Sequence, residues 1–212
     1  MTADATNPPR PAQTLRLARL YAGSRRVPMA LVAVAVCAVA LWIALHRQWN
    51  AYGALQLPLI FETGCAVIIA ATTASPFGDP ERVAGRWLPV LRLGSVLGLT
   101  AAAVGSLAAA GAGTQLATGT LEVTRNLAGL TGIALLCAVV LGGALSWTGP
   151  ATYMVVAVYA LYTQWHGPAL TTPWIWPARP AHDIGAVICA GLVFAAGLAA
   201  ITIRGARDRA GD

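Results

Sequence analysis

Glu62 is the residue of this chain whose position most strongly suggests chemistry. It lies in the segment FETG, about eight residues inside a long apolar block. An ionisable side chain at membrane depth is costly unless it is paired or hydrated, so it is a functional candidate by default. We therefore treat Glu62 as a candidate for a translocation path. The alternative is a neutral or paired carboxyl group that only fixes the packing of neighbouring helices.

Glu122 and Arg125 form a second candidate group near the start of a later apolar block. Their spacing of three residues places both on one face of a helix, and Asn126 follows directly. One interpretation is a structural ion pair at the membrane boundary. The other is that Arg125 reaches Glu62 from the neighbouring helix, which would add both residues to the path.

The remaining reactive residues lack the spacing that catalysis or metal binding requires. The three histidines are scattered along the chain, and the four cysteines lie in four different apolar blocks with no CxxC pair: His46, His166, His182, Cys37, Cys65, Cys137 and Cys189. We expect the cysteines to be reduced packing residues. The chain also lacks the motifs GxxxxGK[ST], GxSxG and HExxH and a GxGxxG in a useful context, so we expect no catalytic residues, no metal and no cofactor.

The composition shows which surroundings must position these residues. Of the 212 residues, 57% are hydrophobic and 10% are charged, against about 25% charged in a soluble domain. This excludes a disordered chain and disfavours a soluble one. The net charge of +6 comes from arginines that flank apolar blocks, which favours a membrane protein and argues against nucleic-acid binding.

The apolar blocks predict an all-α polytopic membrane protein. A spanning helix needs roughly 20 mostly apolar residues. Six spans are predicted over residues 27–45, 55–74, 90–110, 127–146, 150–163 and 184–203. The fifth is short for a bilayer.

The arginine distribution predicts the orientation. Eleven arginines lie before the first span, between spans two and three, or after span six, and three lie in the other loops. Arginine is enriched in cytoplasmic loops. Both termini should therefore be cytoplasmic, which requires an even number of spans.

Four of the segments outside the predicted spans have features of their own. Residues 1–26 read as a disordered tail followed by a short amphipathic helix, Gln13 to Arg26, in the membrane interface. The inner loop from Ser75 to Pro89 contains a possible charged helix from Asp79 to Trp87. The outer loop from Trp165 to Asp183 is rich in Trp and Pro, and we expect it to fold back and cap the outer face. Residues 204–212 form a cytoplasmic tail.

Small residues indicate where helices could approach closely in lipid. Gly94 and Gly98 form a GxxxG pattern in the third span. Further glycines lie along the fourth span at Gly129, Gly132, Gly142 and Gly143. An alanine-rich composition would also produce such patterns by chance.

The arrangement as a whole resembles the type-2 ABC exporter permease. The segments PERVAGRWLPVLRL, TRNLAGLTGIALL and WIWPARPAHD are similar to small Ala-rich members from high-GC bacteria. The resemblance implies a bacterial cell membrane, with Gln13 to Arg26 as the connecting helix. It also implies pairing of two permease chains, as a homodimer or as a heterodimer, with the conduit between them lined by Glu62 and the fifth helix.

The same resemblance implies that the inner loop contacts a separate ATP-binding subunit. The coupling residues would be Asp79, Glu81, Arg82, Arg86 and Trp87. Two other classes remain open from the residues alone. One is an accessory, scaffold or immunity membrane protein without transport, and the other is an intramembrane enzyme that acts on lipid.

Overall fold

The computed structural model describes residues 22–23, 26–47, 51–74, 88–113, 119–163 and 173–205. The regular structure within these residues is entirely helical. The α-helices are α2 (Val27–His46), α3 (Ala51–Ala71), α4 (Leu88–Gly111), α5 (Thr120–Leu141), α6 (Thr148–Tyr162) and α8 (Ile184–Arg204). Two short 3₁₀ helices, η2 (Gly143–Leu145) and η3 (Trp176–Ala178), complete the described elements.

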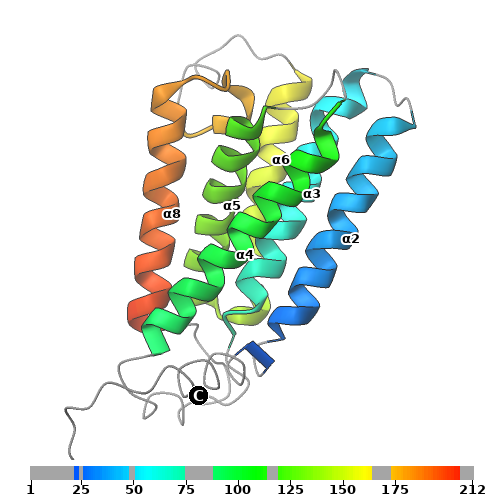
Figure 1. Cartoon of the computed structure of the whole chain (residues 1–212). Coiled ribbons are helices and arrows are strands. Elements are labelled where there is room, and N and C mark those ends of the chain that lie inside the picture. The colour runs from blue at the N-terminus through cyan, green and yellow to red at the C-terminus, as the bar shows by residue number, and fades with distance from the viewer. Residues whose placement is uncertain are drawn as a thin grey trace, which may run out of the picture.

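The six α-helices form one bundle in which successive helices run in alternate directions (Figure 1). The start of α2 and the end of α8 consequently lie at the same end of the bundle. Five described segments are long and apolar enough to cross a bilayer. In the remaining helix, α3, the apolar stretch is shorter and covers residues 56–71. The prediction of an all-helical fold is confirmed for the described residues, and the apolar helices are consistent with a membrane-embedded protein.

The fourth and fifth helices differ from their predicted bounds. The fourth span was predicted over residues 127–146, whereas α5 begins at Thr120 and ends at Leu141. This early start places Glu122 and Arg125 inside the helix. The two charges are tolerated there because both side chains have partners. Its end is set by Gly142, whose φ of 91° is disfavoured for residues with a side chain.

The fifth segment begins earlier than predicted. Gly143–Leu145 forms the 3₁₀ turn η2, α6 follows from Thr148, and together Gly143–Tyr162 makes a 20-residue apolar segment. Residues 143–146, which were assigned to the fourth span, belong to this segment instead. The predicted shortness of the fifth span therefore came from a misplaced boundary.

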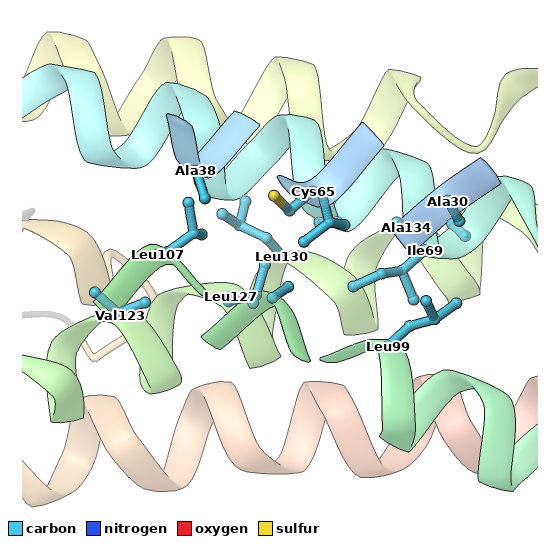
Figure 2. Close-up of a cluster of buried hydrophobic side chains, with 14 of the residues drawn as sticks. Ala30, Ala38, Cys65, Ile69, Leu99, Leu107, Val123, Leu127, Leu130 and Ala134 are labelled. Carbon is cyan, nitrogen blue, oxygen red and sulfur yellow. The ribbon is translucent and has the colours of Figure 1, made fainter. Parts of the chain in front are cut away.

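The core of the bundle is centred on α5. Of its most apolar 18-residue stretch, 61% is buried, compared with 22% for α2 and for α8. Leu127, Leu130 and Ala134 of α5 meet Ile69 of α3 and Leu99 of α4 in the interior (Figure 2). The outer helices instead expose large apolar side chains such as Val32, Leu192 and Ile203, as expected for surfaces that face lipid.

Candidate functional site

Glu62 lies in the interior of the bundle, on the α3 helix that packs against α5. The residue is 1% exposed. Neither carboxyl oxygen has a hydrogen-bond partner of good geometry among the described residues. Neighbouring Thr63 does not help, because its hydroxyl donates to the carbonyl of Leu59 at 2.7 Å. The interior position of this carboxyl group makes it the most unusual side chain of the described bundle.

Asn126 and Arg125 approach Glu62 from α5, and each is 3% exposed. The side-chain amide of Asn126 faces the Glu62 carboxyl group, and Arg125 is close enough for a charge–charge interaction with it. The Arg125 guanidinium nevertheless makes its bonds elsewhere. Its Nη1 donates to the carbonyl of Pro180 at 2.8 Å, its Nη2 to the carbonyl of Arg179 at 3.2 Å, and its Nε to Oδ1 of Asn126 at 3.3 Å.

Of the two interpretations of Glu122 and Arg125, the contacts of Arg125 favour the structural pair. Nη2 of Arg125 lies 4.0 Å from Oε1 of Glu122, one turn away on the same helix. The structural pair is therefore present. No salt bridge joins Arg125 to Glu62 within the described part of the chain, so the alternative of a direct Arg125–Glu62 ion pair is not found there.

The segment Pro173–Asp183, which we call the cap, folds back onto the bundle as predicted. Ile175 and Trp176 are each 2% exposed. The Trp176 ring stacks on Tyr153 of α6 with centroids 4.6 Å apart, and the Tyr153 hydroxyl donates to the carbonyl of Trp174 at 2.9 Å. A Cβ atom added to Gly129 of α5 would collide with the same ring. Residues 164–172 of the predicted outer loop lie outside the described residues.

The cap is joined to α8 through Asp183. Its carboxylate accepts a hydrogen bond from the backbone N–H of Ala186 at 3.0 Å, which caps the helix. Arg179 forms a salt bridge with the same carboxylate. The Ala186 N–H and, to a smaller extent, the Arg179 charge hold the pKa of Asp183 below its ordinary value. The C-terminal part of the cap is thus fixed twice, by Arg125 on α5 and by Asp183 at the start of α8.

The predicted coupling residues Asp79, Glu81, Arg82, Arg86 and Trp87 lie outside the described residues. The same is true of His166 and of most of the predicted interfacial helix, Gln13 to Arg26. The helices that flank the inner loop are described. The end of α3 and the start of α4 lie at the same end of the bundle as the start of α2 and the end of α8 (Figure 1). The coupling residues remain a prediction.

No three His, Cys, Asp or Glu side chains come together in the described ranges in a way that could hold a metal ion. The four cysteines are free thiols, and Cys65 is buried beside the core leucines (Figure 2). The described polar cluster thus consists of carboxyl, amide and guanidinium groups.

The sequence did not reveal the packing role of two residues, one in the cap and one on α8. Trp176 was predicted only as part of the outer loop, and its ring is buried against Gly129 and Tyr153. The sequence signal that could have revealed this contact is Gly129, because a glycine leaves space for a ring from another segment. Gly197 of α8 was also missed, although a Cβ atom there would lie 2.7 Å from the carbonyl oxygen of Gly132.

The comparisons with known proteins give no relative for this chain. It matches no family model, no curated protein and no solved structure.

Proposed function

We propose that this chain is the membrane-spanning permease subunit of an ABC exporter, with all six helices of the bundle crossing the bilayer. The observation that carries the proposal is the arrangement of the two ends of the bundle. The start of α2, the turn from α3 to α4 and the end of α8 share one end, and the cap covers the other (Figure 1).

The charge distribution assigns these ends to the two sides of the membrane. The arginine-rich segments flank the end that holds the start of α2 and the end of α8. Arginine-rich ends face the cytoplasm. In this orientation both termini are cytoplasmic, the inner loop with Asp79 to Trp87 is available to an ATP-binding subunit, and the cap faces outward.

An ATP-binding subunit is part of the proposal because the chain carries no nucleotide-binding motif of the P-loop type. The energy for export would come from that partner and would pass through the inner loop. Two permease chains, alike or different, would pair around the conduit. Glu62 is closed off within the bundle, so it would line a path only when α3 and α5 move apart, whereas Glu122 and Arg125 lie nearer the cap.

The proposal predicts a stoichiometric ATP-binding partner. The tagged chain is purified from its native membrane in mild detergent, and co-purifying proteins and ATPase activity are measured. Arg82→Glu together with Arg86→Glu should abolish both, because a partner surface that binds an arginine-rich loop would repel the reversed charges. The matched control is Arg47→Glu, at the opposite end of α2, where the arginine is exposed. This variant should retain the partner.

A pure preparation without any ATP-binding subunit would contradict the permease function and would favour an accessory or scaffold protein. Equal loss of the partner in Arg47→Glu would contradict the docking role of Arg82 and Arg86, because it would show that charge reversal acts through folding and not through docking.

A further inference from the structure

The Glu62 carboxyl group is buried without the counter-ion that a buried charge requires. It is 1% exposed, and its two oxygens lack hydrogen-bond partners of good geometry among the described residues. A bare carboxylate in an apolar interior is strongly disfavoured, and such groups neutralise themselves by binding a proton unless a cation or several donors compensate the charge.

Arg125 is the cation nearest to this role, and each of its three nitrogens already donates to an acceptor other than Glu62. All three of its donor nitrogens bind other acceptors, two of them the cap carbonyls of Pro180 and Arg179 and the third Oδ1 of Asn126. Its closest carboxylate is Glu122, at 4.0 Å. The guanidinium is therefore committed to the cap and to its own helix.

The other groups near Glu62 do not supply a second counter-charge. Oδ1 of Asn126 accepts from Arg125, which leaves the uncharged Asn126 amide N–H groups for the Glu62 side. Glu122 of α5 adds a second negative charge nearby, and Cys65 of α3 is a thiol with no positive charge. Arg125 supplies the only positive charge that acts on Glu62 among the described residues.

A metal cation would fit this site poorly. Hard cations such as Na⁺ or Ca²⁺ need several converging oxygen ligands. The single side-chain oxygen of Asn126 already accepts a hydrogen bond from Arg125. The nearby Arg125 guanidinium would also repel a second cation. The described residues hold no cluster of metal-binding side chains here. A proton is the ligand that the site can accept.

We propose that Glu62 is an internal proton-binding site and holds one proton at neutral pH while the cap is bound to Arg125. Asn126 then donates to the carbonyl oxygen of the neutral acid. The proposal does not depend on the permease function, because the proton on Glu62 can be measured in the purified chain without any partner.

The test is infrared spectroscopy of the purified chain in lipid nanodiscs with ¹³C-labelled glutamate. The sequence has three glutamates, Glu62, Glu81 and Glu122, so the label reports on three carboxyl groups. We expect one isotope-shifted C=O band of a neutral carboxylic acid at neutral pH. The band should disappear in Glu62→Gln and persist in Glu81→Gln and in Glu122→Gln.

These variants keep the proposal falsifiable even if Glu62→Gln does not fold. A band that persists in both Glu81→Gln and Glu122→Gln belongs to Glu62 by elimination. A wild-type chain without a neutral-acid band would overturn the proposal, and so would a band that Glu122→Gln removes.

The variant Arg125→Gln distinguishes a protonated Glu62 from a Glu62 carboxylate that is neutralised by Arg125. If Glu62 is neutral, the band is already present in the wild type and this variant leaves its intensity unchanged. If Arg125 neutralised Glu62, the wild type would show no band and the variant would gain one. That second result would overturn the proposal.

Discussion

Three glycines of α4 and those at the crossing of α5 and α8 have opposite surroundings. A Cβ atom added to Gly94, Gly98 or Gly105 of α4 would meet no described residue within 4 Å. A Cβ atom added to Gly132 of α5 would lie 2.6 Å from the backbone carbonyl of Val193 on α8. These three α4 glycines are exposed on the single chain, whereas Gly132 lies where two helix backbones touch.

The comparison shows what small residues contribute inside a membrane. Lipid tails are as apolar as leucine, so helices gain little from burying apolar area and depend on close packing instead. Gly132 and Gly197 allow that approach, and α5 makes its most extensive contact with α8. The GxxxG pattern of α4 makes no such contact with the part of the chain that the structure describes. Its face, which includes exposed Leu97, is open to lipid or to a second protein.

Gly132→Ala is the substitution that should disturb the bundle most. The new methyl group would overlap backbone atoms of Val193 and Phe194, which cannot rotate away as a side chain can. We expect a loss of about 2–3 kcal/mol in the free energy of unfolding. Unfolding by heat or by SDS in detergent micelles measures it. Wild-type stability in this variant would mean that α5 and α8 do not touch at this point.

Gly129→Ala should have a smaller effect at the cap end of the same helix. The methyl group would meet the Trp176 ring, which belongs to the cap and can shift more easily than a helix backbone. We expect a loss of about 1–2 kcal/mol. The Trp176→Leu background provides the matched control in the same unfolding assay.

In that background the ring is absent, so Gly129→Ala should cost little. The difference between the two backgrounds is the coupling energy of the pair. Equal costs in both backgrounds would show that the cap does not lie against Gly129.

The sequence predicted those parts of the fold that depend on apolar length alone. α2, α4 and α8 lie within about two residues of their predicted bounds, because each is a long apolar run between polar flanks. The fourth span was misplaced because Glu122 and Arg125 were assumed to lie outside the helix. In the folded chain Arg125 is buried, and its guanidinium donates to acceptors. Hydropathy along one helix does not reveal such partners.

The candidate site was predicted in part for a related reason. Glu62 was identified because a charge within an apolar run is conspicuous. The partners of Arg125 were missed because they are the backbone carbonyls of Pro180 and Arg179, more than fifty positions along the chain. Every residue has a carbonyl group, so no pattern of side chains distinguishes these two acceptors before the cap is folded.

Gly98→Leu should cost the bundle the least stability of these substitutions. It tests the exposed α4 glycines of the comparison. Because none of the described atoms lies within 4 Å of the added Cβ position, we expect no loss of stability in the single chain, and the higher helix propensity of leucine would add at most about 1 kcal/mol. The unfolding assay used for Gly132→Ala measures this under dilute conditions. A loss as large as that of Gly132→Ala would mean that α4 packs on its own chain through this face. If the variant is stable but weakens cross-linking between two differently tagged copies, the exposed α4 glycines lie at a contact between chains, and the GxxxG pattern serves assembly instead of folding.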